Sequence, residues 1–221
     1  ELGFVCISID YRLSPTATFP DHLIDVKRGI AWAKKNAATY GGDPSFVGIC
    51  GNSAGAHLAA LAALTWDDTS LQPGFETDDT RVDACVALYG VYDVTNRFGH
   101  WPGLGILPFW ENVVAKKKLA THPEIFALSS PIDQVRPVAP PFFLLHGKRD
   151  SLVPIKESRR FAEALRATSS SEVLLAEIDD AQHAFEIFHS VRGRYAIQAV
   201  AHFLDVVAKR RMSAAEVASA A

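Results

Sequence analysis

A serine with a glycine two residues to either side, at the end of an apolar run, is the feature that most limits how this chain can fold. The segment reads Gly51-Asn52-Ser53-Ala54-Gly55; it follows the apolar residues 46–50 and precedes an alanine-rich pattern at 54–64 that predicts a helix. A turn that passes directly from a strand into a helix is too tight for side chains at the flanking positions, which favours glycine there. Such a turn exposes the serine hydroxyl at the carboxyl edge of a sheet, beside the positive end of a helix. This position suits a nucleophile that attacks a carbonyl group.

The chain also offers a base and an acid, which a serine hydroxyl needs to become a good nucleophile. Asp150 lies just after the strand predicted at 142–147, and His183 follows the strand predicted at 173–178. Parallel strands gather their functional groups in the loops at one edge of a sheet. Ser53, Asp150 and His183 are therefore expected to meet, in the chain order serine, acid, histidine. Asp93, after the strand predicted at 82–89, is the alternative acid.

Several segments together resemble the esterases and lipases of the α/β-hydrolase superfamily, in the hormone-sensitive-lipase-like and carboxylesterase branch. The matching segments are the serine turn, the run His146-Gly147-Lys148-Arg149-Asp150-Ser151-Leu152-Val153-Pro154, the run Gln182-His183-Ala184-Phe185, and Tyr11-Arg12-Leu13-Ser14-Pro15. The likeness extends from residue 3 to about residue 207.

The resemblance implies a role for each site residue. Ser53 would be the nucleophile, His183 the general base and acid, and Asp150 the carboxylate that orients the histidine. The backbone N–H of Ala54 would donate one hydrogen bond to the oxyanion. The implied reaction is hydrolysis of a small-molecule carboxylic ester through an acyl-enzyme, and it needs no cofactor and no metal.

One motif of these esterases has no counterpart in the chain. They carry a His-Gly-Gly loop upstream, on the strand before the one expected here at residues 2–9, and the only His-Gly pair of this sequence is His146-Gly147 in the acid loop. Each missing oxyanion donor is worth about 3 kcal/mol. We therefore expect the carboxyl-terminal part of a longer hydrolase, lacking the first strands of the fold and impaired in activity. The competing interpretation is an inactive remnant that binds an acyl compound or a partner protein.

Composition excludes several other classes of function. The net charge of −3 leaves no basic surface for nucleic acid or anionic lipid. No run of eighteen apolar residues is present, so no membrane span is predicted. The three cysteines, at positions 6, 50 and 85, each fall in an apolar strand-like run, which predicts buried thiols rather than a disulfide or a metal site.

The order of elements predicts an α/β fold with a mainly parallel sheet and helices on both faces. Strands are expected at 2–9, 46–50, 82–89, 142–147 and 173–178, and a helix from Phe19 to Ala33 with its end at Gly41-Gly42. At 221 residues and 48% hydrophobic, the chain is long enough for one hydrolase domain over residues 1–221.

A stretch at 95–132 breaks this alternation and is expected to be a cap-like insertion. Its aromatic residues Trp101, Phe109 and Trp110 either line an apolar pocket for short or medium acyl chains or fill a small core of the insertion. Both interpretations remain open from the sequence. His57, one helical turn after Ser53, is expected to be a packed, hydrogen-bonded histidine. His146 is expected to support the acid loop.

Overall fold

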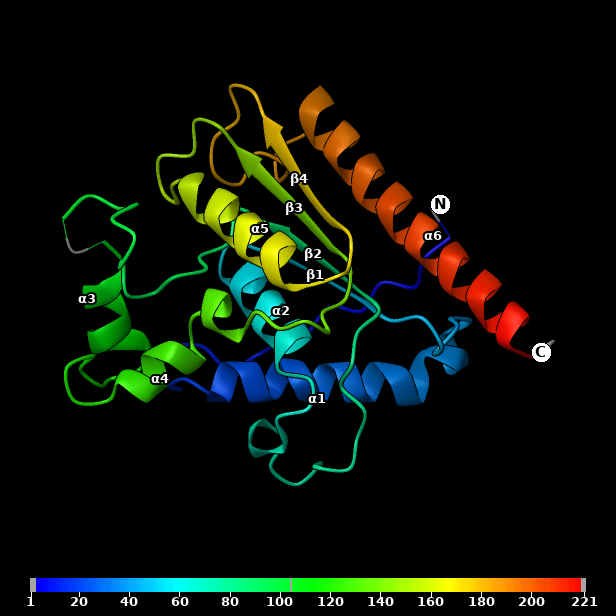
Figure 1. The fold of residues 1–221 in the computed structure, drawn as a ribbon. Helices are drawn as coiled ribbons and strands as arrows, with labels where there is room; N and C mark the ends of the chain where they lie inside the picture. The colour runs from blue at the N-terminus through cyan, green and yellow to red at the C-terminus, as the bar shows by residue number, and fades with distance from the viewer. Residues whose placement is uncertain (1–2, 104, 220–221) are drawn as a thin grey trace.

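The computed structural model describes residues 3–103 and 105–219 (Figure 1). Its sheet has four parallel strands in the order β1-β2-β3-β4. They are β1 (Gly48–Asn52), β2 (Ala84–Leu88), β3 (Phe142–Gly147) and β4 (Val173–Ile178). Asn52 pairs with Leu88, and Leu88 pairs with Leu145. The carboxyl ends of the strands are therefore level, and the loops that leave them start at one edge of the sheet.

Helices cover both faces of the sheet, as the sequence predicts (Figure 1). On one face lie α2 (Ala54–Leu64) and α5 (Lys156–Thr168), and α1 (Asp21–Asn36) packs on α2. On the other face lies α6 (Val191–Ser219). Along β3 the side chains alternate between the two sides, because successive residues of a strand point to opposite faces. Phe142 packs toward α2 and α5, whereas Phe143 packs against Phe203 of α6.

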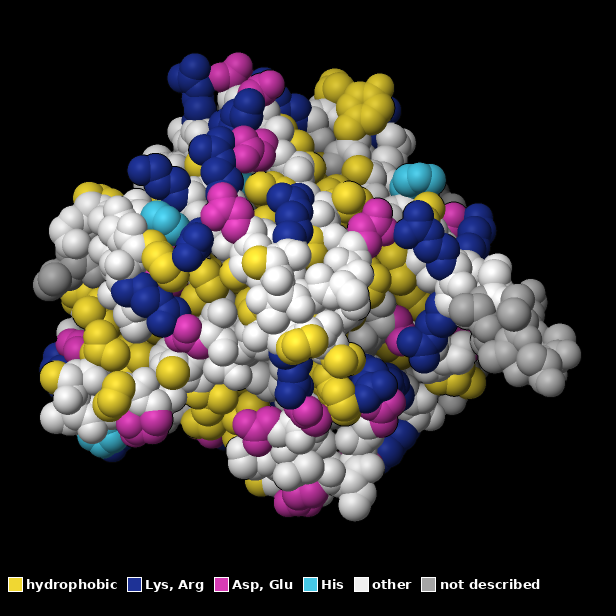
Figure 2. Space-filling model, in the orientation of Figure 1, with side chains coloured by type: hydrophobic (Ala, Val, Ile, Leu, Met, Phe, Trp, Pro, Cys, Tyr) yellow, Lys and Arg dark blue, Asp and Glu magenta, His cyan; other side chains and the backbone are white. Residues whose placement is uncertain are grey.

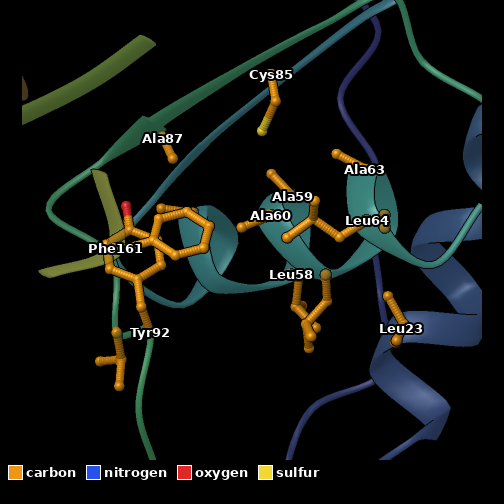
Figure 3. Close-up of a cluster of buried hydrophobic side chains, with 14 of the residues drawn as sticks. Leu23, Leu58, Ala59, Ala60, Ala63, Leu64, Cys85, Ala87, Tyr92 and Phe161 are labelled. Atoms are coloured by element: carbon orange, nitrogen blue, oxygen red, sulfur yellow. The ribbon is translucent and has the colours of Figure 1, made fainter. Parts of the chain in front are cut away.

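Helix α2 is apolar all round because it is enclosed between the sheet and α1. Figure 3 shows Ala59 on the side nearest Cys85 of β2 and Leu58 on the opposite side of the helix. Both side chains are buried. Small alanine side chains let the helix approach the sheet closely, which fixes the position of the start of α2, directly after the serine turn.

The stretch at 95–132, for which a cap-like insertion stays a prediction, forms short helical segments in its described residues and lies beside α2. It includes α3 (Leu107–Phe109), a π-helical turn at Trp110–Val114, α4 (Pro123–Leu128) and a 3₁₀ turn at Pro131–Gln134. Figure 1 shows α3 and α4 at the left of the molecule, away from β4 and α6.

The prediction of a strand at residues 2–9 is wrong. The described residues 3–10 form no strand, and residue 2 lies outside the described residues. Apolar side chains do not make a strand unless the backbone groups also pair. Ile9 instead packs closely on Gly29 of α1, where an added Cβ would lie 2.6 Å from the Cδ1 atom of Ile9. β1 is therefore an edge strand of the described sheet.

The burial expected for the cysteines holds only for Cys85, in the interior strand β2. Cys6 lies in the unpaired amino-terminal run and Cys50 on the edge strand β1, and both are exposed. All three thiols are free. A strand-like pattern does not reveal whether a strand lies inside a sheet or at its edge.

Charged side chains of both signs are interspersed over the face in Figure 2 rather than gathered by sign. Ion pairs such as Lys34 with Asp79 and Arg159 with Glu177 account for part of this mixing. Within the described residues, no helix is long and apolar enough to cross a bilayer.

Candidate active site

Ser53 occupies a strained turn between β1 and α2. Its φ of 51° lies in the left-handed region, which costs free energy for any residue with a side chain. The Ser53 N–H donates to the Leu88 carbonyl at 2.9 Å, which extends the pairing of β1 with β2 into the turn. A Cβ atom on Gly51 would lie 2.2 Å from the Gly55 carbonyl oxygen, so glycine is required there. At Gly55 the nearest atom would be 3.8 Å away, so the close approach expected at both glycines exists only at Gly51.

The structure brings the three predicted polar side chains together at the edge where β1, β3 and β4 end. The distance from His183 Nε2 to Ser53 Oγ is 2.9 Å, and from His183 Nδ1 to the Asp150 Oδ2 atom it is 2.7 Å. The side chain of Asp150 is fully buried, and that of His183 is 15% exposed. This arrangement allows the imidazole to accept the serine proton on one side while it donates to a carboxylate on the other.

Asp150 is held as a carboxylate by the loop around it. Its Oδ1 atom accepts hydrogen bonds from the backbone N–H groups of Leu152 and Val153, at 2.9 and 2.8 Å. Burial raises the pKa of Asp150, but hydrogen bonds from two histidine rings and these two amides outweigh burial and leave the pKa below its ordinary value. A charged carboxylate at this point could stabilise an imidazolium if His183 took a proton.

His146 supports the acid loop, as expected from the sequence. Its ring is fully buried, with Nδ1 at 2.7 Å from Ser158 Oγ and Nε2 at 3.0 Å from the Val153 carbonyl. The same Nε2 atom lies 3.2 Å from Asp150 Oδ2. Both ring nitrogens thus have partners, one on α5 and the other in the acid loop, and the contact with Oδ2 helps to fix where Asp150 lies.

The acid loop and the histidine loop pack directly on each other. The N–H groups of Lys148 and Arg149 donate to the carbonyls of Ile178 and Ala181, at 2.9 and 3.0 Å. A Cβ on Gly147 would lie 2.4 Å from the Ala181 carbonyl oxygen. Glycine at position 147 therefore allows the approach that brings Asp150 within reach of the histidine.

Ala54 is the first residue of α2. The first N–H groups of a helix have no partner within the helix and carry the positive end of its dipole. The Ala54 N–H is therefore placed next to Ser53, where an oxyanion would form.

The alternative candidates have other structural roles. Asp93 is 2% exposed; its Oδ1 accepts from the Thr95 N–H and its Oδ2 from the Arg97 N–H, so it closes the turn after β2. His57 Nδ1 lies 2.9 Å from the Val91 carbonyl, and burial lowers the pKa of His57 to about 4. A buried neutral histidine matches the expectation of a packed side chain.

The three aromatic residues expected to line a pocket differ in environment. Trp110 is buried, packs at 4.9 Å against the His57 ring and donates to Ser129 Oγ at 3.0 Å. Trp101 is half-buried and its Nε1 lies 3.2 Å from Glu157 Oε1. Phe109 is 52% exposed. Trp110 thus belongs to the main hydrophobic core, in contact with α2, and lining a pocket stays a prediction.

Glu186 and Tyr89 are site residues that the sequence reasoning missed. The Tyr89 ring lies 4.4 Å from the His183 ring, and the Tyr89 hydroxyl donates to Glu186 Oε1. The only signal in the sequence is that Glu186 comes three residues after His183. Among the described residues, no group of three or more His, Cys, Asp or Glu side chains could hold a metal ion.

Two curated proteins are similar to nearly the whole of this chain. Esterase LipQ of Mycobacterium tuberculosis is 49% identical over 97% of this chain and 50% of LipQ. Probable carboxylic ester hydrolase LipM of the same organism is 46% identical over 94% of this chain and 48% of LipM. The chain thus spans about half the length of these curated relatives.

A solved structure and a family model show the fold and the family of this chain. A truncated form of a carbohydrate esterase from gut microbiota superposes with a TM-score of 0.76 at 25% identity, over 91% of this chain and 73% of that one. The sequence matches the BD-FAE family over residues 1–165. The finer placement in the hormone-sensitive-lipase-like branch stays a prediction. With the α/β fold in place and the family match covering most of the chain, the chain belongs to the BD-FAE family of α/β-hydrolase esterases.

Proposed function

We propose that this chain hydrolyses carboxylic esters through a covalent acyl-enzyme on Ser53. The observation that carries the proposal is the continuous hydrogen-bonded path from Ser53 Oγ through the His183 ring to Asp150, with distances of 2.9 and 2.7 Å. The names of the relatives LipQ and LipM, an esterase and a probable carboxylic ester hydrolase, support the same chemistry.

The geometry supports a role for each group in the reaction. His183 Nε2 removes the Ser53 proton while Oγ attacks the ester carbonyl carbon. The Ala54 N–H, at the amino terminus of α2, donates to the resulting oxyanion. His183 then protonates the leaving alcohol, and the acyl group stays on Ser53. Water repeats the same steps in deacylation.

For the substrate we propose a small-molecule ester with a short or medium acyl chain. The proposal rests on the aromatic residues of the insertion, of which Trp101 and Phe109 are only partly covered. p-Nitrophenyl esters of graded acyl length test it. A kcat/KM that rises steadily into long acyl chains would contradict it.

Replacement of the nucleophile is the direct test of the mechanism. Ser53→Ala is expected to lower p-nitrophenyl ester turnover by about 10⁴-fold or more and to abolish labelling by a serine-directed phosphonate. Ser45→Ala is the matched control, because Ser45 is exposed and its side chain takes no part in the site. Labelling that survives in Ser53→Ala would remove Ser53 from the mechanism.

The same assay distinguishes the rival function. Stoichiometric binding of an acyl compound without turnover would favour an inactive remnant of a hydrolase. That this chain is impaired relative to longer relatives stays a prediction, and its kcat/KM measured beside that of LipQ tests it.

A further inference from the structure

One carboxylate oxygen joins the nucleophile turn to the histidine loop. Glu186 Oε1 accepts a hydrogen bond from Asn52 Nδ2 at 3.1 Å and another from the Tyr89 hydroxyl. Asn52 is the last residue of β1 and directly precedes Ser53, whereas Tyr89 directly follows β2. Glu186 comes from the loop that carries His183. The contacts of this single atom therefore bridge three chain segments that are far apart in the sequence.

Tyr89 carries the contact to the imidazole. Its ring centroid lies 4.4 Å from that of His183, with 59° between the ring planes. Tyr89 is 1% exposed, and its N–H donates to the Leu145 carbonyl at 2.8 Å. Burial and the hydrogen bond to Glu186 raise the pKa of Tyr89, so the hydroxyl stays protonated and remains a donor. The ring that packs on His183 is thus anchored at its backbone by β3 and at its hydroxyl by Glu186.

The other oxygen of Glu186 indicates that this side chain lowers the stability of the fold. Glu186 Oε2 is buried and has no hydrogen-bond partner among the described residues. A buried polar atom without a partner destabilises a fold, and such exceptions call for an explanation beyond stability. The explanation that fits here is the position of Oε1 between the nucleophile turn and the ring beneath the imidazole.

We infer that Glu186 is a positioning residue. Through Tyr89 and Asn52 it holds the His183 ring at the distance and angle from Ser53 Oγ that proton transfer needs. This inference rests on the proposed esterase function. Glu186 itself contacts neither Ser53 Oγ nor a ring nitrogen of His183, and it acts on the reaction only through its two neighbours. A proton transfer is efficient only while the imidazole keeps its distance and angle to Oγ, and a misplacement of about 1 Å costs as much as 100-fold in rate. Loss of Glu186 should therefore lower kcat and leave KM unchanged.

The test compares Glu186→Ala with Glu186→Gln and Tyr89→Phe. Glu186→Ala removes both hydrogen bonds, and we expect kcat for a p-nitrophenyl ester to fall about 30-fold with KM within about twofold of the wild type. Glu186→Gln keeps an oxygen that accepts from Tyr89 and Asn52, so kcat should stay within about threefold of the wild type. Tyr89→Phe keeps the ring over His183 but loses its anchor, and an intermediate loss is expected. Asp179→Asn, an exposed acid of the same loop, is the control that leaves kcat unchanged.

A second measurement reports whether the His183 ring is held in place, and it needs no substrate turnover. The proton on His183 Nδ1, shared with Asp150, gives a downfield NMR resonance when the ring is held in place. We expect that resonance in the wild type and in Glu186→Gln, and its broadening or loss in Glu186→Ala at a temperature where circular dichroism shows the variant folded.

The outcomes separate this inference from the proposed function. If the wild type hydrolyses esters and Glu186→Ala retains full kcat, the inference fails and the esterase proposal stands. Equal losses in Glu186→Ala and Glu186→Gln, or a loss confined to KM, would also overturn it. If the wild type neither hydrolyses esters nor reacts with a phosphonate, the esterase proposal fails, and an unchanged Nδ1 resonance in Glu186→Ala would overturn the positioning role as well.

Discussion

The loops at the carboxyl ends of the strands and the insertion at 95–132 use polar side chains in different ways. At the strand ends, Ser53, Asp150 and His183 form a hydrogen-bonded path that ends on the Ser53 hydroxyl. In the insertion, the indole N–H groups of Trp110 and Trp101 donate hydrogen bonds to the buried side chains of Ser129 and Glu157. The first region therefore joins the side chains of three separate loops to one another, whereas the tryptophans of the second donate to buried partners in the protein interior.

The difference teaches that side-chain type alone does not mark a functional region. Buried carboxylates follow two neighbouring strands, namely Asp150 after β3 and Asp93 after β2, two residues before the insertion begins. Asp150 has an oxygen directed at a histidine ring, while Asp93 uses both oxygens within its own turn. What separates them is the partner that the fold provides.

The largest effect is expected from the pair Asp150→Asn and Asp93→Asn. Asp150→Asn removes the charge that stabilises the imidazolium, and we expect kcat to fall about 10³- to 10⁴-fold. Asp93→Asn should leave kcat within about threefold, because Asp93 has no contact with His183, and should lower the melting temperature instead. Steady-state kinetics and thermal unfolding of both variants measure this. Comparable losses of kcat in the two variants would contradict the claim that only Asp150 acts on His183.

The next largest effect concerns the packing of the insertion on the main core. Trp110→Ala creates a cavity beside His57 and leaves Ser129 without its donor, so the free energy of unfolding should fall by about 3–5 kcal/mol. Phe109 is 52% exposed, and Phe109→Ala should change the free energy of unfolding by less than about 0.5 kcal/mol. Urea unfolding compares the two. A larger loss of stability in Phe109→Ala would show that the insertion packs differently.

The smallest of the three effects concerns Glu157, which connects the two regions. Its Oε2 atom accepts from the backbone N–H groups of Tyr92 and Asp93, both at 2.9 Å, and its Oε1 atom lies 3.1 Å from His100 Nδ1 and 3.2 Å from Trp101 Nε1. An amide has one acceptor oxygen, so Glu157→Gln cannot serve both sides, and a loss of about 1–3 kcal/mol in the free energy of unfolding is expected.

Hydrogen exchange localises the effect of Glu157→Gln. Amides at 95–101 should exchange faster, while those of β3 stay protected. Glu163→Gln, an exposed acid on the same helix, is the matched control. Faster exchange throughout the sheet would mean that Glu157 supports the whole domain and not the junction with the insertion.

Much of the site followed from local pattern because local geometry governs it. The serine turn needs Gly51, and the order of strand and loop places Asp150 and His183 at the same edge of the sheet. Each of these features depends on residues close in sequence or on the general behaviour of parallel strands. The helix at 54–64 was predicted to its exact bounds for the same reason.

The predictions that were wrong concern features that depend on contacts between segments far apart in the sequence. Residues 2–9 have the side chains of a strand, but pairing depends on a neighbouring backbone that the pattern does not describe. Cys50 lies in a strand yet is exposed, because β1 is at the edge of the described sheet. Gly55 was expected to be as crowded as Gly51, and the path of the chain leaves room there.

The sequence by itself determined the α/β alternation, the strained serine turn and the three polar residues at the strand ends, since each arises from short-range sterics and strand periodicity. Only the tertiary structure decided that Asp150 and not Asp93 meets His183, that Trp110 is enclosed, and that Glu186 reaches Asn52 and Tyr89. These contacts join segments far apart in the chain, and their distances depend on how helices and loops pack against the sheet.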